Sequence, residues 1–239
     1  MNKDEFITYC KKINIEITDT TYNKFNLYYE LLSSWNEKFN LTSIIEKKEV
    51  FLKHFYDSLL LSYYINFKQD SLVCDLGSGA GFPGIPLAII FENIKFILVE
   101  SSNKKCNFLL ETIKQLDLSN VKVVNERAEI YARTNREKFD IVTCRALSHL
   151  SVVSELALPL LKIDGLFVPL KAKIEEELKD SLKQINKLGG IYKKTISYFL
   201  PIEKSTRNIV YIEKKTTTNT LFPREYNQIV KNNLKNKKK

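Results

Sequence analysis

The sequence predicts an α/β protein whose mainly parallel sheet is covered by helices on both faces. From about residue 67 onward, short apolar runs alternate with stretches of helical character, as in successive strand–helix–strand units. The runs are apolar at nearly every position, which is typical of parallel strands buried on both faces. The last two runs have no helix between them, so we expect them to pair as an antiparallel hairpin at one edge.

The residues before this alternation predict a helical extension. Stretches 4–12, 18–38 and 46–65 carry apolar side chains at steps of three or four, the period of one helix face. Many of these side chains are aromatic, and an aromatic stripe is more typical of core packing than of a ligand site. We expect residues 1–66 to form this extension and to pack on the sheet domain.

The alternating region, residues 67–215, should form the sheet domain. Its first five strands are expected at 71–76, 95–100, 121–125, 139–144 and 165–170. The helices between and after them are expected at about 84–92, 103–116, 151–161 and 173–188. The hairpin should use 195–199 and 208–214. Residues 216–239 are polar and end in a lysine-rich stretch, so they predict a basic, flexible, solvated tail.

Composition indicates a chain that can bury a full core and that carries excess positive charge. Of its 239 residues, 44% are hydrophobic, which excludes wholesale disorder. The formal net charge of +9 suggests an anionic partner such as nucleic acid. Lysine supplies most of this charge, however, and a bias toward lysine and asparagine can arise from genome composition alone. Only six residues are arginine, so each arginine is more informative than another lysine.

Several classes of site and location receive no support from the sequence. No apolar run approaches the ~20 residues that a membrane helix needs, and the first residues lack the apolar centre of a signal peptide. A cytoplasmic protein without membrane contact is therefore expected. The four cysteines are scattered, so we expect buried thiols and no metal site. A monomer is the simplest expectation.

The stretch CDLGSGAGFPG, between the first strand and the helix after it, is the main functional signal. Its second half matches the G-x-G-x-x-G fingerprint of dinucleotide-binding proteins. Read from Asp75, it places an acid at the strand end and glycines at positions 77, 79 and 81, the pattern of S-adenosylmethionine enzymes. A dinucleotide needs helix amides aimed at its pyrophosphate, whereas this methyl donor has no phosphate and needs backbone laid against its bulk. Asp75 can receive the donor's amino group, directly or through water.

Acidic residues also follow the next two strands. Glu100 ends the second strand, where an acid can accept both ribose hydroxyls, although nicotinamide enzymes use the same position. Ala128 and Glu129 follow the third strand, where small and acidic residues can hold the edge of an adenine. With the strand order and the terminal hairpin, these positions predict a Rossmann-like class I methyltransferase fold, with a seven-stranded, mostly parallel sheet, that binds S-adenosylmethionine.

Further motifs match one family in order and spacing. WNEKFNLTSI (35–44) is similar to a W-N-x-x-x-N-L-T segment, and HFYDSL (54–59) to H-F-x-D-S-L. Downstream follow ESSNKKCNFL, RAE, TCRALSHL, PLKAK and TRNIVYIEK. With the glycine loop, these segments resemble the bacterial RsmG family, also called GidB or glucose-inhibited division protein B. The resemblance covers about residues 20–214, and after Pro223 and Arg224 the chain departs from the family pattern.

The resemblance implies an enzyme that methylates N7 of a guanine in the decoding-region loop of 16S ribosomal RNA. S-adenosylmethionine would be the donor, and the RNA or the small ribosomal subunit the partner. Guanine N7 has a free lone pair, so no general base is needed, and positioning can contribute ~7–11 kcal/mol. The target base must be unpaired or swung out of its stack.

Position and resemblance together assign candidate roles. The expected donor-binding residues are Asp75, Gly77, Gly79, Gly81, Phe82, Glu100, Ala128, Glu129 and Arg145. The expected catalytic residues are Arg145, His54, Lys171 and Arg207, and the expected RNA-binding residues are Asn40, His54, Lys171 and Arg207. The alternatives are a surface salt bridge for Arg145 and a hydrogen bond from His54 to Asp57.

Two other functions stay open from the sequence alone. The same fold could modify another RNA, a protein or a small molecule, because this fold accepts many substrates. A non-catalytic module that binds RNA or a dinucleotide is the second alternative. The intact acidic and glycine positions argue against it.

Overall fold

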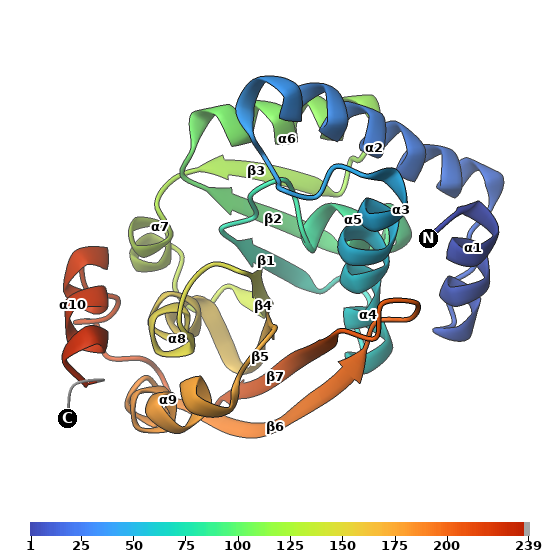
Figure 1. Ribbon diagram of the computed structural model, residues 1–239. Coiled ribbons are helices and arrows are strands. Elements are labelled where there is room, and N and C mark those ends of the chain that lie inside the picture. The colour runs from blue at the N-terminus through green and yellow to red at the C-terminus, as the bar shows by residue number, and fades with distance from the viewer. Residues whose placement is uncertain (237–239) are drawn as a thin grey trace.

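The computed structural model describes the backbone of residues 1–236 and the side chains of residues 1–231. Its centre is a seven-stranded sheet in the order β3-β2-β1-β4-β5-β7-β6 (Figure 1). The strands are β1 (Leu72–Leu76), β2 (Lys95–Glu100), β3 (Val121–Asn125), β4 (Phe139–Arg145), β5 (Leu161–Lys171), β6 (Gly190–Phe199) and β7 (Thr206–Lys214). Strands β1 to β5 run parallel, and β7 is antiparallel to both β5 and β6. The predicted α/β fold with a terminal hairpin is confirmed.

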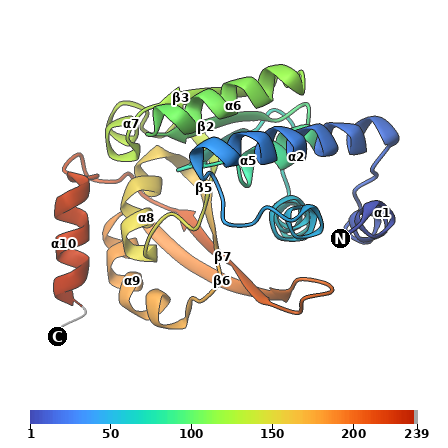
Figure 2. The same cartoon turned by 45° about the horizontal axis from the view of Figure 1, so that its top comes forward.

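Helices cover both faces of this sheet. On one side lie α1 (Lys3–Lys12), α2 (Asp19–Phe39), α3 (Lys47–Val50), α4 (Asp57–Tyr64), α5 (Gly84–Ile90) and α6 (Asn103–Gln115). On the other side lie α7 (Ala128–Thr134), α8 (Leu150–Ala157), α9 (Glu175–Lys187) and α10 (Tyr226–Asn236). Figure 2 shows α2 lying along α6, and α10 standing beside α8. Among the residues described, no helix is long and apolar enough to cross a membrane.

Two hydrophobic cores follow from the alternation of side chains along the strands. Val73 packs into the core under α4, α5 and α6, whereas the next residue, Cys74, packs into the core under α7 and α8. On β5, Val168 packs into the first of these cores and Phe167 into the second. Successive side chains of a strand point to opposite faces, so both faces of β1 and of residues 167–170 of β5 are buried.

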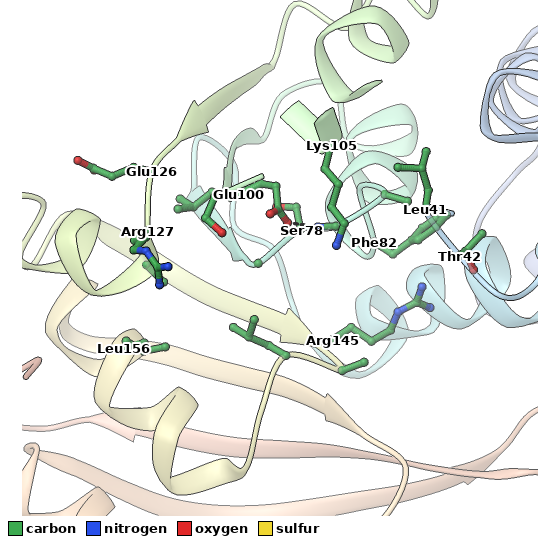
Figure 3. A pocket seen from close by; sticks show the side chains of 18 of the residues that line it. Leu41, Thr42, Ser78, Phe82, Glu100, Lys105, Glu126, Arg127, Arg145 and Leu156 are labelled. Carbon is green, nitrogen blue, oxygen red and sulfur yellow. Dashed lines mark hydrogen bonds between the residues drawn. The ribbon is translucent and has the colours of Figure 1, made fainter. Parts of the chain in front are cut away.

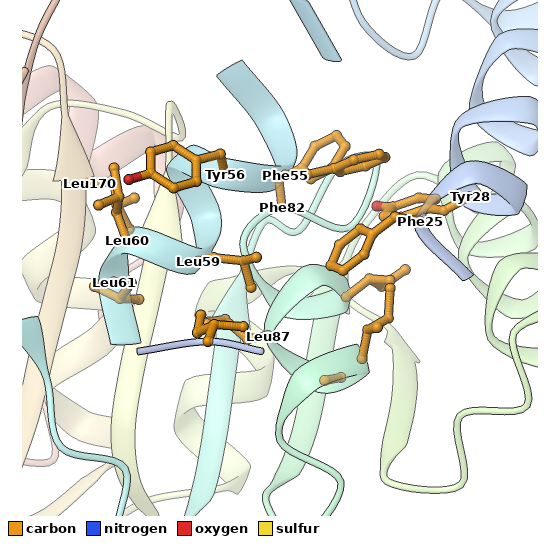
Figure 4. Close-up of a cluster of buried hydrophobic side chains, with 14 of the residues drawn as sticks. Phe25, Tyr28, Phe55, Tyr56, Leu59, Leu60, Leu61, Phe82, Leu87 and Leu170 are labelled. Atoms are coloured by element: carbon orange, nitrogen blue, oxygen red, sulfur yellow. The ribbon is translucent and has the colours of Figure 1, made fainter. Parts of the chain in front are cut away.

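The N-terminal extension packs directly on the glycine-rich turn through aromatic rings (Figure 4). Tyr28 on α2 stacks on Phe82 with 5.5 Å between ring centroids and on Phe55 with 5.1 Å. Its hydroxyl donates a hydrogen bond to the carbonyl oxygen of Ala80. Offset and edge-on ring pairs add attraction beyond the apolar area they bury. The aromatic stripe of α2 is therefore core, as predicted.

The helix expected over 46–65 forms, but its middle is π-helical. The π-helical segment Phe51–Tyr56 lies between α3 and α4 and continues into both. Such wide turns are rare and occur frequently at functional sites. This segment carries His54, which the sequence had singled out.

The prediction of a solvated tail from Thr216 is wrong for the part that the structure describes. Thr218, Phe222 and Ile229 are buried, and α10 runs from Tyr226 to Asn236. The sequence did not predict α10 or the short helix α7. Polar composition hid the buried positions of this segment, since a few widely spaced buried side chains do not make a visible periodic stripe. The final lysines at 237–239 lie outside the described residues.

We predict that Phe25→Ala lowers the free energy of unfolding by about 3–5 kcal/mol, because it empties a well-packed aromatic site. Phe25 is fully buried, and its ring contacts Phe6 and Phe55 at 5.2 Å. Urea-induced unfolding followed by circular dichroism measures the loss. Phe199→Ala is the control, because its side chain is 70% exposed and its loss should stay within about 0.5 kcal/mol. Equal losses would contradict the assigned core.

Candidate functional site

A cavity of about 520 Å³ opens where the carboxyl ends of β1, β2 and β4 meet. This end of a parallel sheet is where open α/β folds bind ligands. Leu41, Thr42 and Arg145 lie at one end of the cavity, and Arg127 and Leu156 at the other (Figure 3). The cavity is long enough to have two distinct ends, one beside the N-terminal extension and one beside α7 and α8.

The turn after β1 forms the floor of the cavity and uses its own amides internally. The amides of Gly77 and Ser78 both donate to the carbonyl oxygen of Val99 on β2, at 2.8 and 3.2 Å. The amide of Gly79 donates to Oε2 of Glu100 at 3.0 Å. These bonds fix the turn against β2 and leave its backbone lying along the cavity.

The first amides of α5 are also engaged or missing. Gly84, the first helical residue, donates to Oδ2 of Asp75 at 2.9 Å. Ile85 donates to the carbonyl oxygen of Gly81 at 2.8 Å, and Pro86 has no amide hydrogen. The helix begins at Gly84, where the sequence predicted its start, and ends at Ile90. An anion such as a pyrophosphate needs free amides at a helix N-terminus, and this helix offers none of its first three.

Three glycines of the turn, Gly77, Gly79 and Gly81, adopt a left-handed backbone conformation that other residues avoid. Gly77 has φ +66° and Gly79 has φ +61°. A Cβ on Gly77 would lie 2.4 Å from Cδ1 of Leu147, whereas a Cβ on Gly79 would only be in ordinary contact, 3.9 Å from the carbonyl oxygen of Gly77. Glycine is favoured at both positions by φ, and at Gly77 the side chain of Leu147 would also have to move to admit a Cβ.

Asp75 lies beneath the turn and is fully buried. Burial raises the pKa of its carboxyl to about 7, against the lowering effect of the Gly84 amide. Its Oδ1 has no hydrogen-bond partner among the described residues. A buried acceptor without a partner is costly, so this oxygen is suited to meet a donor group that arrives with a ligand. Neither Asp75 nor Gly81 is part of the cavity wall itself.

Carboxylates line the middle of the cavity and the end beside α7 and α8. Glu100 accepts from Gly79 and, through Oε1, from the amide of Ser102 at 2.8 Å. Each of these oxygens keeps a second lone pair that can accept another hydrogen bond. Glu129 is buried on α7, 3.7 Å from Nη1 of Arg127. Ala128 lines the same end, as the sequence predicted.

Arg145 lies at the end of β4 and is held by the π-helical segment. Its Nη1 donates to the carbonyl oxygen of Lys53 at 3.0 Å, and its Nη2 donates to Nδ1 of His54 at 3.0 Å. The guanidinium lies over the ring of Phe82, 4.8 Å from its centroid. Arg145 is therefore not in a surface salt bridge, and it joins the N-terminal extension to the sheet.

The contacts of His54 fix its protonation. A guanidinium can only donate, so Nδ1 of His54 is the acceptor and the ring hydrogen is on Nε2. Nε2 then donates to Oγ1 of Thr42 at 3.0 Å. Burial, together with Arg145, lowers the pKa of His54 to about 3, so the imidazole is neutral near pH 7. The hydrogen bond to Asp57 expected as an alternative is not formed, because Arg145 occupies Nδ1.

Asp57 anchors the cluster that Arg145 and His54 form. It is 2% exposed, accepts from the hydroxyl of Tyr198 at 2.9 Å, and lies 3.5 Å from Arg145 and 3.7 Å from Arg207. Burial raises its pKa, and Arg145 opposes that rise. Arg207 therefore touches the cluster through Asp57, and it does not line the cavity.

Besides Asp75 and Gly81, three further expected site residues do not line the cavity. Besides Arg207, Lys171 pairs with Glu177 at 2.8 Å and with the carbonyl oxygen of Ser148, which holds the turn before α8. Asn40 ends α2 with φ +48°, a conformation that asparagine tolerates better than most residues. Its role is to turn the chain so that Leu41 and Thr42 reach the cavity. By contrast, the structure brings His54, Phe82, Arg145 and the acidic residues together.

Some residues of the cavity were not anticipated as site residues. Thr42 and Leu147 stand inside segments that the resemblance had marked, and Lys105 stands in a third such segment. Those segments were the signal from which these three residues could have been identified. No such signal pointed to Tyr226, because it lies in the tail that was expected to be solvated.

Comparison with known proteins identifies relatives of the whole chain. The profile of a family described as rRNA small subunit methyltransferase G (GidB) matches residues 21–210. A ribosomal RNA small subunit methyltransferase G of Bacillus licheniformis is 46% identical over 228 residues, covering 94% of this chain and 95% of the relative. Its namesake in Staphylococcus saprophyticus is 47% identical over 213 residues, covering 88% and 89%.

Solved structures share the fold at much lower identity. A SAM-dependent methyltransferase from Aquifex aeolicus matches with a TM-score of 0.53 and 17% identity, over 71% of this chain and 94% of that chain. At this identity the likeness concerns the fold alone.

We predict that Gly77→Ala destabilises the protein more than Gly79→Ala does. Both replacements place alanine at a left-handed φ, which costs about 1–2 kcal/mol, but only the first also collides with Leu147. Urea unfolding of the two variants measures the difference. Adding Leu147→Ala to Gly77→Ala should remove the excess loss, and an unchanged excess would contradict the collision.

Proposed function

The chain belongs to the rRNA small subunit methyltransferase G family, and from this we propose that it transfers a methyl group from S-adenosylmethionine to N7 of a guanine in 16S ribosomal RNA. The observation that carries the proposal is the turn after β1. Its amides and the first amides of α5 are used internally or missing, while Asp75 keeps a buried oxygen without a partner. This arrangement suits a cationic ligand without phosphate and disfavours a dinucleotide.

The residues at hand fit the methyl donor. The backbone at Gly77 and Gly79 would lie against it, and Asp75 would meet its ammonium group, directly or through water. The free lone pairs of Glu100 would accept the two ribose hydroxyls, and Ala128 with Glu129 would bracket the adenine. When bound, the donor supplies a methyl group on a positively charged sulfur.

The opposite end of the cavity would receive the guanine. Thr42, His54 and Arg145 line this end. The guanidinium of Arg145 can donate to guanine O6 with its remaining hydrogens, in the way arginine reads guanine in nucleic-acid grooves. Thr42 accepts from Ile44 and His54, so its hydroxyl hydrogen remains as a further donor.

No residue needs to remove a proton, because N7 already carries a lone pair. The neutral His54, whose only ring hydrogen is donated to Thr42, would orient Arg145 and Thr42. Catalysis would then rest on alignment of N7 with the methyl group, which can contribute ~7–11 kcal/mol. Arg207 would act as a positioning residue through Asp57, and Lys171 by holding the turn after β4. The lysine-rich surface would contact phosphates, and free RNA and the assembled small subunit are both possible substrates.

Mass mapping of 16S ribosomal RNA from cells with and without this gene tests the proposal. We expect one guanine to lack its methyl group, a mass lower by about 14 Da, when the gene is absent, and to carry it again when the gene is restored. The gene is restored in two matched forms, the wild type and a Gly77→Asp variant. An unchanged modification pattern would contradict the assigned reaction.

We also predict that S-adenosylhomocysteine binds more tightly at pH 8 than at pH 6. The pKa of Asp75 near 7 means that its carboxyl is largely protonated at pH 6 and ionised at pH 8. Only the ionised form attracts the ligand's ammonium group, so affinity should rise by up to about tenfold per pH unit below the pKa. Calorimetry at both pH values measures the change. Asp75→Asn should bind weakly with no such dependence, and a flat profile in the unaltered protein would oppose the role of Asp75.

A further inference from the structure

The C-terminal segment Thr218–Glu225 is clamped onto the sheet domain by arginines. Arg133 on α7 donates to the carbonyl oxygen of Pro223 at 3.0 Å and to Glu225 at 2.7 Å. Arg136, just after α7, donates to the carbonyl oxygen of Phe222 at 2.7 Å and to that of Thr218. In a chain whose positive charge is mostly lysine, two of the six arginines, one on α7 and one just after it, hold this segment.

A third arginine, Arg224, fastens the segment to α8. Its amide and Nε donate to Oε1 of Glu155 at 3.0 and 2.9 Å, and its Nη2 donates to Oε2 at 2.6 Å. Glu155 is fully buried, and Gln184 also donates to it. A buried carboxylate must be paired to be tolerated, so this contact fixes the position of the chain at Arg224. Planar, forked guanidinium groups match such sites better than lysine does.

The clamp ends at Glu225, immediately before Tyr226, the residue that it places in the cavity wall. Tyr226, the first residue of α10, lines the cavity together with Ala128 and Leu156. Its ring also packs on the core under α7 and α8. Arg133 therefore ties the helix that begins with Ala128 to the chain that presents Tyr226. The C-terminal segment completes the wall of the cavity at its far end from Arg145.

We propose that Tyr226 forms one wall of the purine subsite of this cavity, and that Arg133, Arg136 and Arg224 hold it there. The inference rests on the proposed function, in that the purine is the adenine of the methyl donor. An aromatic ring beside a purine excludes water and adds stacking attraction. The C-terminal segment is thus a part of the donor site. Its composition is polar because arginine contacts hold it in place, where other segments are held by an apolar stripe.

Calorimetry with two ligands tests the inference. S-adenosylhomocysteine has both the adenosine and the amino acid, whereas 5′-methylthioadenosine has only the adenosine. We expect Tyr226→Ala to weaken both ligands by the same factor, roughly tenfold. Tyr226→Phe keeps the ring and should bind both within about twofold of the unaltered protein.

Gln228→Ala is the matched control, because Gln228 is exposed on the same helix and does not line the cavity. It should leave both affinities unchanged. If Tyr226→Ala does not fold, as judged by its melting curve without ligand, Tyr226→Leu keeps apolar packing without the ring and should show the same loss.

Unchanged affinities in Tyr226→Ala would overturn the inference while leaving the proposed function intact. Weakening of S-adenosylhomocysteine alone would also overturn it, because the ring would then lie at the amino acid end. Failure of the unaltered protein to bind either ligand would instead overturn the proposed function, and the purine subsite with it.

Discussion

The site depends on the way the turn between β1 and α5 satisfies its own hydrogen bonds. Gly77 and Ser78 bond to β2, and Gly84 bonds to the buried carboxylate of Asp75. A turn whose amides pointed outward would bind anions, as in dinucleotide-binding proteins. Here the same glycine spacing produces a backbone surface with acidic groups behind and beside it. These acidic groups, rather than free amides, face the ligand at this turn, which suits a cationic donor.

The N-terminal extension is part of the site because of one buried charge cluster. Asp57 on α4 attracts Arg145 from the sheet and Arg207 from the hairpin, while the π-helical segment bonds to Arg145 through Lys53 and His54. Removing these charges from water is costly, and the cost is offset only while all partners stay in place. The extension, the sheet and the hairpin are consequently held in one arrangement at the end of the cavity that faces Thr42.

The two ends of the cavity are built by different chemistry. Aromatic rings and a neutral histidine surround Arg145, so this guanidinium is oriented in a largely dry setting. At the other end, arginine contacts to main-chain carbonyls and to Glu155 bring Tyr226 beside α7 and α8. The first end is suited to hold a base by directed hydrogen bonds, and the second to hold a flat ring by contact.

The sequence by itself determined the layered α/β fold, the seven strands and the glycine turn, because these depend on local spacing. Alternation and helical period report which side chains are buried, and a left-handed turn needs glycine wherever it occurs. Glu100, Ala128, Glu129, His54 and Arg145 could be placed near the site because residues at the ends of parallel strands, or in family motifs, carry positional information. Only the tertiary structure separated Arg145 and His54, which line the cavity, from Lys171, Arg207 and Asn40, which do not. It also placed Tyr226, in the presumed tail, in the wall of the cavity. Those outcomes depend on contacts between segments far apart in the chain, such as Arg224 with Glu155, and no local pattern specifies which distant partner a buried charge will find.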